Sequence, residues 1–252
     1  MTISFQLYSA RNFQPWDDVV ATLARAGYEA VEGYGDVYVD AGGFRSLLDS
    51  HGLKMPSGHF SLEYLENDPA GAAATARTLG IESIYCPWLD EAARPADAAG
   101  WIGFARRLAA IGRRMSDEGL RFGWHNHDFE FATLPDGDMP MHIILEEAPG
   151  IAWEADIAWI ARGGADPFDW IDRYGSRLGA VHVKDIAPAG TALEEDGWAD
   201  VGHGTLDWAR LLAMLADKAA TTLYVLEHDN PADLARFAGR SIDWVKGRNP
   251  RP

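Results

Sequence analysis

The sequence contains a single cysteine, few basic residues and no long apolar run. Cys86 alone cannot form an internal disulfide or a thiolate metal cluster. Lysine and arginine number 22 against 38 aspartates and glutamates, and this acidic balance argues against binding to nucleic acid or to an anionic membrane surface. No apolar stretch approaches the roughly 20 residues of a membrane-spanning helix. The amino terminus lacks the basic and apolar regions of a secretory signal, so we expect a cytoplasmic protein.

Apolar and aromatic residues, in contrast, are abundant. The 252 residues are 47% hydrophobic and include ten tryptophans, a composition that can fill a sizeable core and that is not typical of disordered proteins. A single α/β barrel has about 250 residues, and no linker, charge block or low-complexity segment divides the chain. We therefore expect one domain over residues 1–252.

Short strand-like apolar runs alternate with longer helical patterns along the whole sequence. Proline near the start of a helical pattern and glycine just after its end, as at Pro15 and Gly27, are typical helix boundaries. Eight strand–helix units predict parallel strands joined by helical crossovers, and hence a single (β/α)8 TIM barrel. An open doubly wound sheet is the alternative, but residues 8–11 lack the glycine-rich phosphate loop typical of that fold. The predicted strands span residues 3–8, 28–32, 53–57, 83–86, 121–127, 151–156, 178–184 and 222–227.

The predicted strands end in polar and titratable residues. In a (β/α)8 barrel these carboxyl ends carry the active site, and a polar ring there is costly unless it is paired, hydrated or bound to metal. Asp156, His182 and Glu227 each lie at the end of a strand. Two carboxylates and an imidazole, without sulfur, suit a divalent ion. We expect Mn²⁺, with Mg²⁺, Co²⁺ or Zn²⁺ as alternatives.

A fourth ligand is expected from the fifth strand, where two residues compete. His125 lies on the strand itself, whereas Glu130 lies in the following loop and could fold back over the ion. We favour Glu130, because two carboxylates and an imidazole would gain more from a third carboxylate.

Several short motifs follow one another in a specific order and spacing along nearly the whole chain. They are Trp-His-Asn-His-Asp-Phe-Glu at 124–130, Glu-Ala-Asp at 154–156, Ala-Arg-Gly-Gly-Ala-Asp-Pro at 161–167, His-Val-Lys-Asp at 182–185, Val-Gly-His-Gly at 201–204 with Asp-Trp at 207–208, and Glu-His-Asp-Asn-Pro at 227–231. In these motifs the chain resembles the sugar phosphate isomerase/epimerase family of xylose isomerase-like TIM barrels. The resemblance implies a metal-dependent enzyme acting on polyols, keto-sugars or related carbonyl compounds. It also implies an ion held by an acidic residue of strand five and by Asp156, His182 and Glu227.

The sequence departs from that family at two positions. Many relatives have Glu-Asn-His where this chain has His-Asn-His at 125–127, so an imidazole replaces the usual carboxylate ligand. Trp159 stands where many relatives have a histidine. An indole cannot transfer protons, but it can stack on the face of a sugar.

The expected reaction is enolisation of a keto-sugar or keto-polyol. The ion would act as a Lewis acid towards the carbonyl, and a general base would lie within about 3 Å of the carbon that loses its proton. We expect His127 and Glu227 to be the catalytic residues. Reprotonation of the enediolate gives isomerisation or epimerisation, whereas loss of a β-leaving group gives dehydration or glycoside elimination, so a lyase is an alternative.

Other polar residues at the strand ends are expected to bind the substrate. They are Glu32, His59, His125, Trp159 and Lys184. Three of them also have a structural alternative: Glu32 could pair with Lys54 or Arg11, His59 could cap its loop, and Lys184 could pair with Asp185. A non-catalytic carbohydrate-binding barrel and a metal-dependent hydrolase are the competing functions, and a homo-oligomer is possible in each case.

Overall fold

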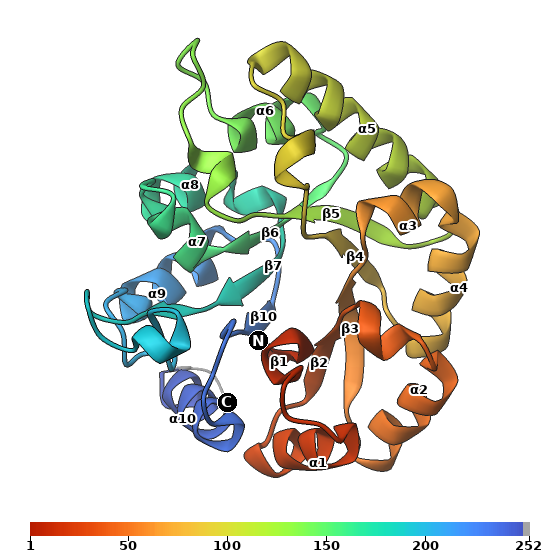
Figure 1. The fold of residues 1–252 in the computed structure, drawn as a ribbon, viewed down its shortest axis with the longest axis vertical. Coiled ribbons are helices and arrows are strands. Elements are labelled where there is room, and N and C mark those ends of the chain that lie inside the picture. Colours follow the sequence, from red (N-terminus) through yellow and green to blue (C-terminus); the bar gives the residue numbers. More distant parts are fainter. Residues whose placement is uncertain (249–252) are drawn as a thin grey trace.

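Eight parallel strands close into a barrel in the computed structural model, which describes residues 1–248 (Figure 1). The barrel strands are β1 (Thr2–Gln6), β2 (Ala30–Gly33), β3 (Lys54–His59), β4 (Ser83–Cys86), β5 (Arg121–His125), β6 (Ala152–Asp156), β7 (Leu178–Val183) and β10 (Leu223–Leu226). They follow one another around the barrel in chain order, and β1 pairs with β10 to complete the circle. This closure confirms the predicted (β/α)8 fold and excludes the open sheet. The last four residues of the predicted domain lie outside the described part of the chain.

Helices connect the strands and surround the barrel (Figure 1). They are α1 (Trp16–Ala26), α2 (Ala41–Ser50), α3 (Leu62–Asn67), α4 (Pro69–Leu79), α5 (Ala98–Asp117), α6 (Pro140–Glu147), α7 (Ile157–Arg162), α8 (Pro167–Tyr174), α9 (Trp208–Lys218) and α10 (Leu234–Lys246). The short helices α3 and α7 were not predicted. Across residues 1–248, no helix has the combined length and apolarity needed to cross a membrane.

Local sequence signals set the ends of several helices. Asp40 and Asp68 each accept a hydrogen bond of 2.9 Å from the backbone amide three residues on, at Gly43 and Gly71, and so cap α2 and α4. Gly27 ends α1 with a φ of 89°, a left-handed conformation that favours glycine. The capping residues therefore fix where each helix begins and ends relative to the barrel.

The main core fills the space between the barrel and its helices. Trp101, Trp124, Trp153 and Trp208 are all buried there. Cys86 ends β4 within the same core, and burial raises the pKa of its thiol to about 12. The only cysteine is therefore a neutral packing residue at physiological pH rather than a thiolate ligand.

The connection after β7 contains a hairpin that the sequence pattern did not predict. Strands β8 (Asp185–Ile186) and β9 (Trp198–Ala199) pair antiparallel outside the barrel. The Asp185 carboxylate accepts hydrogen bonds from three backbone amides within residues 202–206. Asp185 thus stabilises this connection, and the ion pairs of Lys184 are made with other residues.

Candidate functional site

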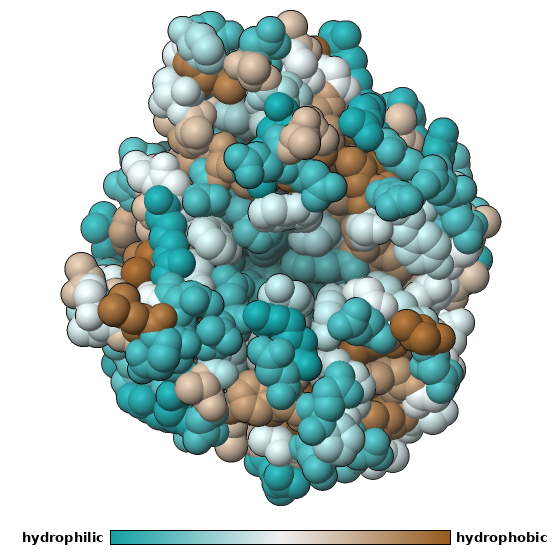
Figure 2. Space-filling view, viewed as in Figure 1, coloured by the Kyte–Doolittle hydropathy of each residue, from teal (hydrophilic) through white to brown (hydrophobic). Residues whose placement is uncertain are grey.

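A cavity of about 1060 Å³ lies over the carboxyl ends of the barrel strands. The space-filling view shows a central hollow with a hydrophilic floor (Figure 2). His125 and Glu227 line this cavity, and Asp156 and His182 are fully buried beside them. The polar strand ends predicted from the sequence therefore converge at one place.

Four side chains from neighbouring strands form a group that fits a divalent cation. His125, Asp156, His182 and Glu227 each offer one ligand atom, and these atoms all lie within 4.8 Å of one another. Asp156 Oδ2 is buried without a hydrogen-bond partner among residues 1–248, and burial raises the pKa of Asp156 to about 7. A cation would satisfy this oxygen, and two carboxylates with two imidazoles are suitable ligands for one.

The two ring nitrogens of His182 face different carboxylates. Nδ1 lies 2.9 Å from Glu227 Oε2, whereas Nε2 lies 2.7 Å from Glu32 Oε1. Glu32 also accepts hydrogen bonds from Gln6, at 2.7 Å, and from Ser57. Metal-ligating histidines commonly donate their other N–H to a carboxylate, which fixes the ring. This arrangement leaves Nδ1 for the ion and makes Glu32 a positioning residue behind the cavity.

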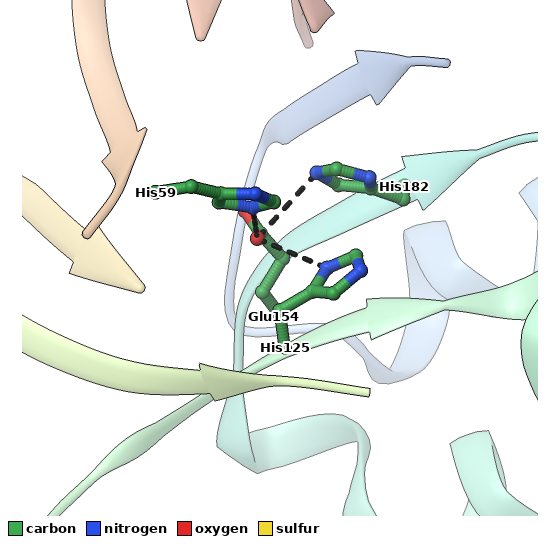
Figure 3. A group of neighbouring side chains, drawn as sticks. All are labelled: His59, His125, Glu154 and His182. Carbon is green, nitrogen blue, oxygen red and sulfur yellow. Dashed lines mark hydrogen bonds and ion pairs between the residues drawn. The ribbon is translucent and has the colours of Figure 1, made fainter. Parts of the chain in front are cut away.

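Glu154 connects three imidazoles on the other side of the group (Figure 3). Its Oε2 lies 2.6 Å from His59 Nε2, 3.2 Å from His125 Nδ1 and 3.5 Å from His182 Nε2. Ligand atoms of these four residues also lie within 4.8 Å of one another. Because this group shares His125 and His182 with the first, and one Glu154 oxygen already contacts all three rings, we interpret it as the network that orients them.

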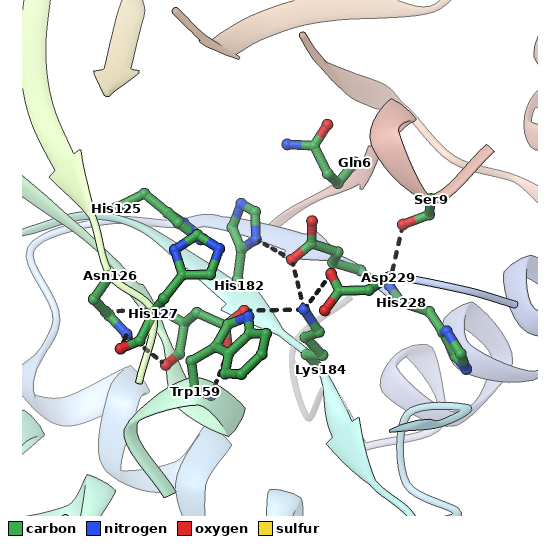
Figure 4. Close-up of polar contacts among 12 residues, drawn as sticks. Gln6, Ser9, His125, Asn126, His127, Trp159, His182, Lys184, His228 and Asp229 are labelled. Carbon is green, nitrogen blue, oxygen red and sulfur yellow. Dashed lines mark hydrogen bonds and ion pairs between the residues drawn. The ribbon is translucent and has the colours of Figure 1, made fainter. Parts of the chain in front are cut away.

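Lys184 lies among the carboxylates of the site (Figure 4). Its Nζ is 3.3 Å from Glu227 Oε2, 3.7 Å from Asp156 Oδ2 and 2.5 Å from Asp229 Oδ1. Burial alone would lower the pKa of Lys184, but Asp229 and Glu227 outweigh it and raise the pKa above its usual value. The ammonium therefore stays charged. It is fully buried and is not among the residues that line the cavity.

Glu130 lies outside both groups. Its carboxylate accepts hydrogen bonds from Trp124 Nε1, at 2.8 Å, and from the His127 backbone amide, at 2.9 Å. The loop forms a 3-10 turn over Phe129–Phe131 and encloses this carboxylate, whose pKa burial raises to about 8. One oxygen is thus bonded to β5 and the other to the loop itself. The structure brings His125, not the favoured Glu130, to the other three ligands.

His127 and Trp159 face the cavity as the sequence predicts. Burial and the neighbouring His125 lower the pKa of His127 well below its usual value, so its ring is neutral. Its Nδ1 has no hydrogen-bond partner in the described structure, and its ring centre lies 5.3 Å from that of Trp159. Five predicted site residues line the cavity: His59, His125, His127, Trp159 and Glu227.

Glu154 and Asp229 have no predicted role, although both contact the site. Each lies two residues from a predicted ligand, Asp156 or Glu227. Side chains two residues apart on a strand point to the same face. This period-two spacing is the signal that identifies Glu154, and it extends to Asp229 just beyond β10.

Comparison with protein families identifies the fold and its relatives. A family model described as a xylose isomerase-like TIM barrel matches residues 20–248. The chain belongs to the xylose isomerase-like TIM barrel family. One curated relative is the rhizopine catabolism protein MocC of Rhizobium meliloti, which is 21% identical over 93% of this chain and 88% of its own length.

Several solved structures superpose on nearly the whole chain. A sugar phosphate isomerase/epimerase from Parabacteroides distasonis has a TM-score of 0.81 and 18% identity, covering 99% of this chain and 94% of its own. A probable 3-DHS dehydratase, AsbF of Bacillus anthracis, has a TM-score of 0.77 and 15% identity, covering 99% and 100%. The IolI protein with a bound zinc atom has a TM-score of 0.75 and 14% identity, covering 98% and 96%. These likenesses support the family fold.

Proposed function

We propose that this protein is a divalent-metal-dependent enzyme that isomerises or epimerises a keto-sugar or keto-polyol through an enediolate. The observation that carries the proposal is the buried group of two carboxylates and two imidazoles at the floor of an open cavity. The isomerase/epimerase name of a structural neighbour supports the substrate class.

His125, Asp156, His182 and Glu227 would hold the ion. When bound, it would supply Lewis-acid polarisation of the substrate carbonyl. Imidazole in place of a third carboxylate shifts the ligand set towards nitrogen, which favours Zn²⁺ or Co²⁺ relative to Mg²⁺. The zinc bound by IolI agrees with this preference. We therefore include Zn²⁺ beside the Mn²⁺ expected from the sequence.

His127 is the best-placed residue to take up the substrate proton. It lines the cavity next to His125, and its Nδ1, which has no hydrogen-bond partner among the described residues, can accept a proton. The Trp159 ring packs against that of His127 with a centroid distance of 5.3 Å. Glu227 is held in its charged form by Lys184 and His182, so we assign it to the ion rather than to proton transfer.

The His59–Glu154 pair supports elimination as a second candidate function. The His59 ring lines the cavity, and its Nε2 lies 2.6 Å from the Glu154 carboxylate. Against the lowering effect of burial, Glu32 and Glu154 raise the pKa of His59 above its usual value. A protonated His59 ring could therefore donate its proton to a departing oxygen and become a neutral imidazole. With such a donor, the enediolate would lose water or an alcohol instead of being reprotonated at carbon. The dehydratase name of one structural neighbour is consistent with this outcome.

Solvent deuterium exchange tests the proposed enolisation. Protein loaded with Mn²⁺ or Zn²⁺ is incubated in D₂O with keto-inositols, keto-hexoses and 3-keto-glycosides, and deuterium in substrate and product is measured by mass spectrometry. We expect incorporation beside the carbonyl that depends on the metal. A product of unchanged formula indicates isomerisation, and loss of water or alcohol indicates elimination. A product of hydrolysis without deuterium would support a hydrolase, and an isomer without deuterium would contradict exchange through an enediolate. Bound metal with neither exchange nor product would support a binding protein.

Replacing Glu32 by glutamine is expected to weaken divalent-metal binding about ten- to a hundredfold. Glutamine has only one acceptor oxygen, so it cannot replace both Oε1, which faces Gln6 and His182, and Oε2, which faces Ser57. The hydrogen bonding that fixes the His182 ring is therefore weakened. Affinity is measured by competition with a chelator. Glu29→Gln is the matched control because Glu29 is exposed near the other end of the same strand. Equal affinity in the Glu32 variant and wild type would contradict a positioning role.

A further inference from the structure

The cavity extends beyond the space that one sugar needs at the ion. Its volume of about 1060 Å³ reaches the upper end of the roughly 300–1,000 Å³ typical of pockets for drug-sized ligands. A six-carbon sugar is considerably smaller than such ligands. Its lining includes aromatic residues from the segments that follow β1–β4, namely Tyr8, Tyr34, Tyr38, Phe60, Tyr64 and Trp88.

Trp88 is exposed and yet fixed in place. Its side chain has 46% of its surface accessible, while its Nε1 donates a 3.0 Å hydrogen bond to Asp90. The Arg94 guanidinium lies 4.8 Å from the indole centre, and the ring meets His127 edge-on at 5.0 Å. A rigid aromatic surface therefore lies directly beside the residue that we assign to proton transfer.

Tyr8 presents a second exposed ring at the same cavity, with 40% of its surface accessible. The Arg11 guanidinium lies 4.0 Å from its ring centre, and Tyr34 packs against it edge-on at 5.5 Å. Val39 and Leu193 are more exposed but do not line the cavity. Aromatic surface that is both held and open to a cavity is suited to stacking on a ligand ring.

The charges around the cavity disfavour an anionic ligand. Acidic residues outnumber basic ones in its lining. Arg107 is engaged by both carboxylate oxygens of Glu66, each 3.1 Å from a guanidinium nitrogen, and Arg11 donates to the main-chain carbonyls of Tyr8 and Asp229. Both arginines of the described lining thus already have partners, so a phosphate group would meet mainly negative charge.

We propose that the substrate is an uncharged glycoside whose second ring, from a sugar or an aryl group, lies against Trp88 and Tyr8. The placement of the reacting sugar at the ion rests on the proposed function. The second ring rests on the aromatic surface, the cavity volume and the charge of the lining. Specificity would then come from the β1–β4 side of the cavity, and chemistry from the β5–β10 side.

Binding of non-reacting glycosides to the metal-loaded protein tests this proposal. Methyl β-glucoside, methyl β-cellobioside and phenyl β-glucoside lack a carbonyl group, so calorimetry measures their affinity without turnover. We expect at least one two-ring compound to bind about tenfold more tightly than methyl β-glucoside. Trp88→Ala should remove that advantage and leave methyl β-glucoside affinity within about twofold. Leu193→Ala, at an exposed position outside the cavity, should change neither value. The two two-ring probes distinguish a sugar from an aryl ring.

Three results would overturn the second-ring proposal. The first is equal affinity for one-ring and two-ring compounds, which includes no measurable binding of either. The second is an equal loss of affinity for both kinds of compound in Trp88→Ala. The third is tighter binding of glucose 6-phosphate than of the neutral probes. Deuterium exchange without a two-ring preference would leave the proposed function intact and reject the second ring. A two-ring preference without exchange on any keto compound would do the reverse.

Discussion

Replacing Glu227 by glutamine is expected to lower metal-dependent deuterium exchange on the order of a thousandfold or more. The carboxylate lies 2.9 Å from His182 Nδ1 and 3.3 Å from Lys184 Nζ, and it belongs to the four-residue group that would hold the ion. The amide removes its negative charge from a buried site, where electrostatic effects on catalysis are large. Exchange rate and bound metal are measured together on the purified variant.

Asp229→Asn is the matched comparison for the Glu227 variant. Both substitutions convert a carboxylate that contacts Lys184 into an amide, but Asp229 is not part of the ion-binding group. We expect a smaller loss of about ten- to a hundredfold for Asp229→Asn, with metal content unchanged. A Glu227→Gln protein that keeps its metal and exchanges at more than about one tenth of the wild-type rate would contradict our assignment.

Substitutions at His125 and Glu130 are expected to have opposite consequences. His125→Ala removes one of the four ligand atoms, so its metal affinity should fall about a hundredfold or more. Glu130→Gln should retain metal affinity within about threefold. It should instead lower the free energy of unfolding by about 1–3 kcal/mol, because one of the two buried N–H donors, on Trp124 or His127, loses its acceptor.

Chelator competition and denaturant unfolding of both variants measure these effects. Denaturation of His125→Ala without metal establishes that it folds, and His125→Gln provides a second variant if the alanine protein does not. Loss of metal by a stably folded Glu130→Gln, with His125→Ala unaffected, would restore the carboxylate ligand that the sequence favoured.

Much of the fold could be predicted because its signals are local. Helix caps such as Asp68 and terminal glycines such as Gly27 act through backbone groups within a few residues. Buried parallel strands also appear as short apolar runs between helical patterns. The hairpin of β8 and β9 was not predicted because both strands are only two residues long and depend on the distant loop that Asp185 holds.

The convergence of Asp156, His182 and Glu227 could be predicted because a closed barrel gathers all strand ends at one rim. The role of Glu130 could not, because it depends on which donors its carboxylate meets when the loop folds. Trp124 and the His127 amide lie within six residues of it and bind both of its oxygens. The preference of a metal ion for a third carboxylate ligand does not offset these two hydrogen bonds of Glu130.

Lys184 illustrates the same limit on sequence reasoning. Its place at a strand end correctly predicts proximity to the site, but its depth depends on three-dimensional packing. Three carboxylates and the absence of solvent exposure make it an internal counter-charge. Residue type and position along the strand therefore predict which groups gather at the site, whereas hydrogen-bond partners decide which of them face the cavity.

Anomalous diffraction from crystals of the protein soaked in Mn²⁺ or Zn²⁺ tests the central claim most directly. We expect one strong peak within about 2.0–2.3 Å of ligand atoms of His125, Asp156, His182 and Glu227. A peak centred instead among His59, His125, Glu154 and His182, or no peak in the cavity with either metal, would contradict this assignment of the ion site.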